Sequence, residues 1–308
     1  MGEKMDIKRY LQEKKEVVDS ALERYFPSLP APHRESDGPP SLYNAIRHSL
    51  FAGGKRIRPI LSMAAFEATG GKGNGILPFA CALEMIHTYS LIHDDLPAID
   101  NDDYRRGKPT CHKVFGEAVG ILAGDALLTE AFRLMAGCHY QACPSVDQGV
   151  VLDLIREVAQ AAGVLGMVGG QVVDVESEGR EVDLSTLVYI HTHKTGAMIS
   201  VSIRVGARLG GAKDETLTAL THYGERIGHA FQIADDILNV EGDAYLLGKK
   251  TGSDSLKKKA TYPSVLGLEE SKRRAKEMVA MALDGLGPFG READPLREIA
   301  RFIVTRQY

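Results

Sequence analysis

The stretch ILPFACALEMIHTYSLIHDD, residues 76–95, is almost wholly apolar until it ends in Asp94 and Asp95. A helix that is apolar on most sides is buried inside a protein. The stretch RIGHAFQIADDILNV, residues 226–240, has the same character and also carries a double aspartate near its end. The sequence therefore predicts two interior helices whose acidic ends form a pocket if they face each other.

From Ser41 onward, segments rich in Ala, Leu, Met, Glu and Ile alternate with short breaks such as TGGKGNG at 69–75. No segment has a convincing strand pattern, and no repeated βα units occur. We predict one all-α domain spanning residues 1–308, with about ten helices bundled around a central cavity. Residues 4–25 form an amphipathic helix whose apolar stripe is Ile7, Leu11, Val17, Val18 and Leu22. The proline-rich stretch that follows stops this helix, so residues 1–40 are predicted to form a separate arm and linker.

Composition excludes several classes of protein. The 308 residues are 44% apolar and 25% charged, with 37 basic and 41 acidic side chains. A net charge of -4 gives no global basic field for nucleic acid. The four cysteines form no CxxC pair, the N-terminus has no signal-peptide core, and no apolar stretch is long enough to span a membrane. We expect a cytoplasmic protein without stable membrane insertion and without a nucleic-acid partner.

The first acidic cluster lies in IHDDLPAIDNDDYRRGKPT, residues 92–110, where two arginines directly follow five aspartates. Burying any of these carboxylates unpaired would cost several kcal/mol, so a cation is required nearby. Asp94, Asp95 and Asp100 do not share one face of a regular helix. Pro97 disrupts the helix, and the extra chain can bring Asp100 back toward Asp94.

The second cluster is simpler. Gln232, Asp235, Asp236 and Asn239 share one helical face. Oxygen ligands without His or Cys select Mg²⁺ or Mn²⁺, and Mg²⁺ binds through a few carboxylates together with substrate phosphates. A lone Asp-Asp pair is more often a solvated helix end. Two such pairs, each at the end of an apolar helix, favour a metal site.

Basic residues lie in the segments around these clusters. They are Lys55, Arg56 and Arg58 in GGKRIRP, Arg105 and Arg106, Lys194, and Lys249, Lys250, Lys257, Lys258 and Lys259. Because these side chains bind phosphate, we predict two diphosphates, one held through metal and one held directly. The stretch GDAYLLGKK at 242–250 lacks the spacing of a P-loop, and the histidines of HTH at 191–193 read as surface or core residues.

With these blocks in place, the chain resembles the trans-prenyltransferases that make short linear isoprenoid diphosphates, most closely the bacterial farnesyl diphosphate synthases. The resemblance runs through GGKRIRP, IHTYSLIHDDLPAIDNDDYRRGKPT, GMVGGQVVDV, HKTGAM, FQIADDILNVEGD and LGKKTGSD. It implies an isoprenoid-synthase helical fold, a homodimer, and three Mg²⁺ ions with Mn²⁺ as the alternative metal. The implied partners are isopentenyl diphosphate and an allylic diphosphate.

The resemblance also implies roles for individual residues. Asp94, Asp100 and Asp235 would bind metal, with Asp95, Asp174 and Asp236 in support. Arg105, Lys194, Thr195, Gln232 and Lys249 would hold the allylic diphosphate, and Lys55, Arg58, His87 and Arg106 would hold isopentenyl diphosphate. The catalytic set would be Asp94, Asp95, Asp100, Arg105, Lys194 and Asp235. His87 also reads as a satisfied core histidine. The family has Asp where Asn239 stands here, which would weaken the third metal.

Product length is expected to depend on Tyr89, about 7.5 Å below Asp94 along the helix axis, or on Ser90, which lies nearer the face of Asp94. An aromatic residue at position 89 is a feature in which the chain resembles the enzymes that make farnesyl diphosphate. If Tyr89 only fills the core, geranylgeranyl diphosphate is the alternative product. A rival of another class is a non-catalytic regulatory subunit, but that would have eroded acidic motifs. Segment 241–262 is the expected lid, and the glycines of 163–171 either kink a helix or permit close packing.

Overall fold

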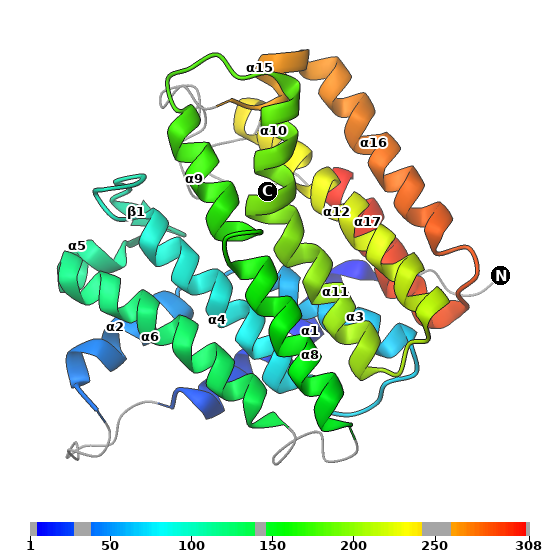
Figure 1. The fold of residues 1–308 in the computed structure, drawn as a ribbon, viewed down its shortest axis with the longest axis horizontal. Coiled ribbons are helices and arrows are strands. Elements are labelled where there is room, and N and C mark those ends of the chain that lie inside the picture. The colour runs from blue at the N-terminus through cyan, green and yellow to red at the C-terminus, as the bar shows by residue number, and fades with distance from the viewer. Residues whose placement is uncertain (1–4, 28–37, 139–145, 242–259, 306–308) are drawn as a thin grey trace.

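The computed structural model describes residues 5–27, 38–138, 146–241 and 260–305, and within these ranges the chain is almost entirely helical (Figure 1). The N-terminal half contains α1 (Ile7–Tyr25), α2 (Pro40–Leu50), α3 (Ile57–Ala68), α4 (Leu77–Asp94), α5 (Cys111–Phe115), α6 (Glu117–Ala136) and α8 (Gln148–Ala162). The C-terminal half contains α9 (Met167–Ser177), α10 (Leu184–Ile190), the π-helix η2 (His191–Gly196), α11 (Ala197–Leu209), α12 (Asp214–Glu241), α15 (Tyr262–Leu266), α16 (Leu268–Gly285), the 3-10 helix η3 (Arg291–Ala293) and α17 (Asp294–Thr305). The predicted all-α class is confirmed.

Helix α4 is the interior helix that its sequence predicts. Phe79, Leu83 and Ile86 are fully buried, and the helix packs against α6 and α3. The second acidic helix, α12, packs against α11 and α16 and buries Ile227, Ala230 and Ile233. Each helix therefore has neighbours that hold its acidic end in place.

Helix α1 does not form the separate arm that the proline-rich stretch after it suggested. It contacts α3, α4 and α17, and it buries Val18 and Leu22 completely. Val17, which the predicted stripe included, is 38% exposed, whereas Tyr10 lies in the interface instead. The apolar face is thus rotated slightly from the prediction, and the N-terminal helix is an integral part of the bundle.

A small hairpin departs from the all-helical expectation. Strand β1 (Tyr104–Arg105) pairs antiparallel with β2 (Lys108–Pro109), beyond the end of α4 (Figure 1). The two turn residues, Arg106 and Gly107, have φ of 54° and 74°. Positive φ at both central positions is the signature of a type I′ turn, which closes a two-residue hairpin. Its two-residue strands are too short for a period-two pattern to reveal them.

The glycine-rich stretch at 163–171 serves both of the purposes considered for it. Helix α8 ends at Ala162 and α9 begins at Met167, so the stretch breaks the helical path. Within α9, a side chain at Gly170 would collide with the backbone of Lys194. Close packing of α9 against η2 therefore depends on this glycine. Within the residues that the structure describes, no helix is both long and apolar enough to cross a membrane.

Candidate active site

The first acidic cluster begins where α4 ends. Asp94 is the last residue of the helix, and the chain then turns back on itself. The backbone N–H of Asp100 donates to the carbonyl of Asp94 at 2.8 Å, and the N–H of Asn101 donates to the carbonyl of Leu96 at 3.0 Å. The predicted return of Asp100 toward Asp94 across Pro97 is confirmed.

The next aspartate, Asp95, faces the hairpin. Arg105 donates from Nε to Asp95 Oδ1 at 2.7 Å, and its Nη2 lies 2.6 Å from the same oxygen. Burial raises the pKa of Asp95, and the hydrogen bond and charge of Arg105 oppose that rise. Asp95 and Arg105 are both expected to act in catalysis. They form one ion pair, in which Asp95 orients the guanidinium.

Three cations lie at the start of α3, with Lys55 and Arg56 in the loop before it and Arg58 in its first turn. Lys55, Arg56 and Arg58 are all among the residues that line the cavity, but Arg56 is only 3% exposed and its guanidinium is held by three protein groups. Each nitrogen of the Arg56 guanidinium donates to a protein group, which disfavours the expected role of Arg56 in binding phosphate. Arg106 approaches the same loop and donates to the carbonyl of Gly53.

The π-helix η2 packs against both α9 and α12. Lys194 Nζ lies 2.7 Å from Asp174 Oδ2 on α9, and Thr195 Oγ1 donates to Gln232 Oε1 on α12 at 2.9 Å. Because π-turns are rare and frequently lie at functional sites, their occurrence here draws attention to Lys194 and Thr195. The sequence predicted a helix but not this widened turn.

The four polar residues of α12 separate into two pairs. Gln232 and Asp235 line the cavity. Asp236 is buried, accepting from Gln232 Nε2 at 3.1 Å and from the backbone N–H of Tyr262 at 2.8 Å. Asn239 is buried as well, and a neutral amide costs less to bury than a carboxylate. The departure from the family's acidic motif therefore falls at an interior position.

These groups surround one cavity of about 900 Å³. The predicted site residues that line it are Lys55, Arg58, His87, Tyr89, Ser90, Asp94, Arg105, Arg106, Lys194, Thr195, Gln232 and Asp235. The predicted residues outside its lining are Asp95, Asp100, Asp174 and Asp236, and Lys249 lies outside the described residues. Nearly all the predicted cations and amides thus converge, although they come from segments spread over most of the chain.

Several lining residues had no predicted role. They are Glu84, Asp102, Tyr104, Gln171 and Glu176. Gln171 is notable because neither atom of its buried amide has a hydrogen-bond partner in the structure. A buried amide without partners is costly and is expected at a position that meets a ligand. The only sequence signal was a polar residue in the apolar stretch GMVGGQVV.

The wall of the cavity away from the charges is apolar. Met167, Val168, Val172 and Phe231 contribute to it. Tyr89 also lines the cavity while being only 6% exposed, and its ring packs edge-on against His93 at 5.6 Å. Burial, with a smaller contribution from Asp94, raises the pKa of Tyr89 to about 12, so the phenol stays neutral.

The cationic side of the cavity controls the charge of His87. Burial, followed by Arg58, Arg106 and Arg105, lowers the pKa of His87 well below its ordinary value. His87 is therefore neutral at pH 7 and can act as a hydrogen-bond donor without adding charge. Its position among these arginines, as a cavity-lining residue, favours the binding role over that of a satisfied core histidine.

The fold and the cavity together fit an anionic head group joined to an apolar tail. The polyprenyl synthetase family model matches residues 39–285. The farnesyl diphosphate synthase of Geobacillus stearothermophilus is 48% identical over 99% of this chain and 99% of its own length. The geranylgeranyl diphosphate synthase of Cyanophora paradoxa is 47% identical over 96% of this chain and 95% of its own.

Among solved structures, an FPP/GFPP synthase from Zymomonas mobilis matches with a TM-score of 0.82 and 37% identity, covering 97% of this chain and 98% of that chain. The chain belongs to the polyprenyl synthetase family. It is therefore a prenyltransferase of the trans-prenyl diphosphate synthase type, which lengthens an allylic diphosphate with isopentenyl diphosphate.

Proposed function

We propose that the protein makes farnesyl diphosphate by adding isopentenyl diphosphate to dimethylallyl diphosphate and then to geranyl diphosphate. The observation that carries the proposal is the position of Tyr89, a buried aromatic ring in the cavity lining five residues before Asp94 on α4. A ring there limits the length of tail that fits. The name of the Geobacillus relative supports the same product.

The donor set fits Mg²⁺. Asp94 and Asp235 line the same cavity from α4 and α12, and both offer hard oxygen ligands. Among the described residues, no three His, Cys, Asp or Glu side chains converge to hold an ion by themselves. Mg²⁺ usually keeps several waters and binds through one or two carboxylates plus substrate phosphates, which suits such a site. Asp94, Asp100 and Asp235 would hold the ions, and bound Mg²⁺ would neutralise charge on the diphosphate.

The other groups bind and orient the two substrates. Arg105 and Lys194 would hold the allylic diphosphate and stabilise it as it leaves, because cations placed at developing negative charge lower the barrier. Lys55, Arg58 and Arg106 would hold isopentenyl diphosphate, with His87 donating a hydrogen bond. The double bond of isopentenyl diphosphate then attacks the allylic carbon. The condensed cation loses a proton to the departed diphosphate. No protein nucleophile takes part.

The apolar wall has a chemical task in this reaction. An allylic cation reacts with water, so the site must exclude solvent while the C–O bond breaks. Met167, Val172 and Phe231 supply such a surface. Thr195 and Gln232 also line the cavity and are hydrogen-bonded to each other, and they would help to hold the allylic diphosphate. The lid proposed for segment 241–262 lies almost wholly outside the described residues.

A second candidate product is geranylgeranyl diphosphate, since the Cyanophora relative carries that name. It requires a tail that passes Tyr89. A non-catalytic regulatory subunit is disfavoured, because Asp94 and Asp235 both line the cavity with the cations still around them.

The decisive experiment incubates purified protein with isopentenyl diphosphate, each allylic starter and Mg²⁺, then sizes the dephosphorylated alcohols. We expect farnesol as the main product and no elongation after chelation. Asp94→Asn should lower kcat by on the order of 100-fold or more, because it removes an anionic ligand of the Mg²⁺ that would neutralise the leaving diphosphate. Asp103→Asn is the matched control, since Asp103 belongs to the same acidic run but pairs with Lys113 at 2.7 Å. Elongation by metal-free protein would contradict the proposal.

A homodimer is part of the proposal. Large apolar side chains are exposed on α6, α8 and the segment before α9, among them Leu122 at 57%, Leu152 at 68%, Val164 at 79% and Leu165 at 69%. Apolar patches of this kind mark interaction sites in soluble proteins. A second copy of the chain is the partner that the family resemblance implies.

A further inference from the structure

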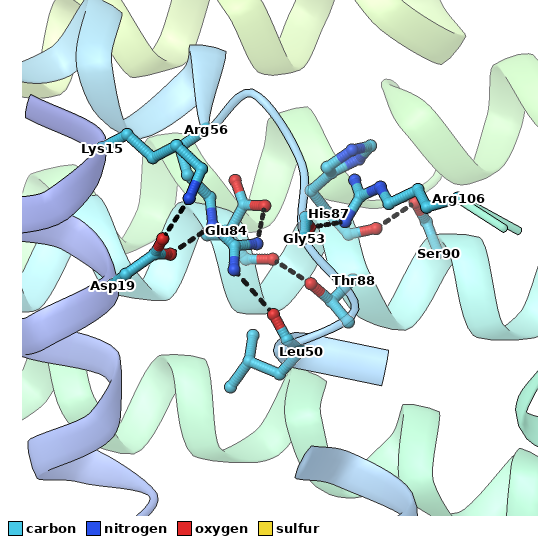
Figure 2. Close-up of polar contacts among 10 residues, drawn as sticks. All are labelled: Lys15, Asp19, Leu50, Gly53, Arg56, Glu84, His87, Thr88, Ser90 and Arg106. Carbon is cyan, nitrogen blue, oxygen red and sulfur yellow. Dashed lines mark hydrogen bonds and ion pairs between the residues drawn. The ribbon is translucent and has the colours of Figure 1, made fainter. Parts of the chain in front are cut away.

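The guanidinium of Arg56 links three elements of the bundle (Figure 2). Its Nε donates to Asp19 Oδ1 of α1 at 2.8 Å, Nη1 to Glu84 Oε1 of α4 at 2.7 Å, and Nη2 to the carbonyl of Leu50 at the end of α2 at 2.7 Å. The side chains of Arg56 and Glu84 are 1% and 2% exposed. Arginine suits this position because its planar fork can serve several acceptors at once.

The backbone of Arg56 is as constrained as its side chain. Its φ of 53° and ψ of 36° lie in the left-handed region, immediately before α3. A non-glycine residue there is held in place by its surroundings, and such residues cluster at functional sites. Its neighbours Lys55 and Arg58 line the same cavity on either side of this fixed position. The contacts of one buried side chain therefore hold the backbone that carries two further cations.

The same loop also positions Arg106 from the hairpin. Gly53 accepts a hydrogen bond from Arg106 through its carbonyl (Figure 2). At Gly54, whose φ is 127°, a Cβ would lie 2.7 Å from the guanidinium carbon of Arg106. A shift of the loop would therefore displace Arg106 together with Lys55 and Arg58.

Glu84 supplies the opposing charge beneath this group. It lies one turn before His87 on α4, and its carboxylate attracts Arg58 and Arg106 as well as Arg56. A buried carboxylate at the base of several cations keeps them together when no substrate is bound. Arg56 and Glu84 thus form the support on which the cationic surface rests.

We infer that Arg56 is a positioning residue for the isopentenyl diphosphate subsite, and that Asp19 makes the N-terminal helix α1 a functional part of that subsite. The inference rests on the proposed assignment of Lys55, Arg58 and Arg106 to isopentenyl diphosphate. Each guanidinium nitrogen of Arg56 donates to a protein group, so Arg56 acts through its neighbours. Its contacts tie the loop before α3 and the first turn of α3 to α1, α2 and α4.

The test compares steady-state kinetics of Asp19→Ala and Arg56→Lys in the full-length enzyme. Removing one hydrogen bond to a charged group predicts that Asp19→Ala raises the KM for isopentenyl diphosphate about five- to tenfold. The KM for geranyl diphosphate and the kcat should change by less than about twofold, because the allylic subsite does not use this loop. Asp19→Asn keeps an acceptor and should recover part of the loss. Arg56→Lys should exceed Asp19→Ala, since lysine cannot reach three acceptors.

Glu23→Ala is the matched control. Glu23 is also on α1, and it pairs with Arg47 of α2 at 3.0 Å, away from the cavity lining. Glu23→Ala removes the same kind of ion pair and should leave the KM values for isopentenyl diphosphate and geranyl diphosphate unchanged.

An unchanged KM for isopentenyl diphosphate in Asp19→Ala overturns the inference, as does a parallel change in both KM values, because a purely structural role would loosen both subsites. If Arg56→Lys does not fold, Asp19→Ala decides alone, since its carboxylate is partly exposed. Wild-type protein that does not elongate overturns the proposed function and this inference together. If the wild-type enzyme is active and the variants keep the wild-type KM for isopentenyl diphosphate, only the inference is overturned.

Discussion

Neighbouring charged residues of this protein have opposite environments. Arg56 is buried and held by three protein groups while Arg58 is half-buried, and Asp236 is buried and accepts from the backbone N–H of Tyr262 while Asp235 is half-buried. In both pairs the buried member has fixed protein partners, because a buried charge without partners would cost several kcal/mol. The less buried members, Arg58 and Asp235, are the ones that the proposed function assigns to substrate and metal.

Strain is concentrated at the same residues. Among the described residues, the non-glycine residues with positive φ are Arg56, Asn101 and Arg106. One precedes α3, one follows the turn that returns Asp100 to Asp94, and one closes the hairpin. Each such conformation costs on the order of 1 kcal/mol or more and persists only where neighbouring contacts hold it. These positions place the charged groups around the head of the cavity.

Tyr89 carries the prediction at the scale of one residue. Tyr89→Ala removes the ring from the cavity lining and leaves room for a longer tail. We expect the main product to shift from farnesyl to geranylgeranyl diphosphate, measured by chromatography of the dephosphorylated alcohols. Tyr43→Ala on α2, which is outside the cavity lining, should leave the product unchanged. An unaltered C15 product from Tyr89→Ala would contradict the assignment of Tyr89 as the floor.

At the scale of one element, the π-helix η2 joins chemistry to packing. Lys194 and Thr195 line the cavity, whereas His191 is buried, with Nε2 3.7 Å from Asp236 Oδ2 and its ring tilted by 37° against that of Tyr262. The wider π-turn allows residues so close in sequence to serve different neighbours. Close approach of α9 at Gly170 keeps the turn in position.

His191 should make stability depend on pH. Burial lowers its pKa from 6.5 to about 3. Between these values the unfolded chain binds a proton that the folded chain does not. Stability therefore falls as the pH drops from about 6.5 toward about 3, by up to about 1.4 kcal/mol for each pH unit.

His191→Gln should remove this contribution, so its urea midpoint should fall less than the wild-type midpoint between about pH 7 and about pH 5. His222→Gln, at an exposed position on α12, is the matched control and should retain the wild-type dependence. Equal slopes for wild type and His191→Gln would show that the imidazole does not titrate in this way.

At the scale of the whole molecule, two hydrophobic cores meet along the cavity. One is centred on α4, α6 and α8, and the other on α3, α11, α12 and α17. The acidic end of α4 comes from the first core and that of α12 from the second. Small shifts between the cores would therefore change the distance between the two groups of carboxylates.

The last prediction concerns the exposed apolar surface of α6 and α8, where Leu122 and Leu152 lie. Replacing Leu122 and Leu152 together by Glu should raise the dimer dissociation constant on the order of 100-fold or more, since each buried leucine contributes about 1.5–3 kcal/mol. Light scattering after size exclusion would measure the mass. Met281→Glu, on an exposed part of α16, is the control. A double variant that keeps the wild-type mass would show that this surface is not the interface.

The sequence by itself determined the helical class, the interior helices and the residue types of the site. Helical periodicity and apolar content follow from local chemistry, and a gathering of carboxylates must be met by cations. The return of Asp100 followed from Pro97 in the same way.

The tertiary structure alone decided which charged residue of each pair is buried among protein partners, that α1 belongs to the bundle, and that η2 is a π-helix. The partners that bury Arg56 lie 28 and 37 residues away in the chain, at Glu84 and Asp19. Periodicity fixes the face of a helix on which a side chain lies. It does not specify which distant group meets that face, and that meeting determines whether a charge is paired inside the protein or left for substrate.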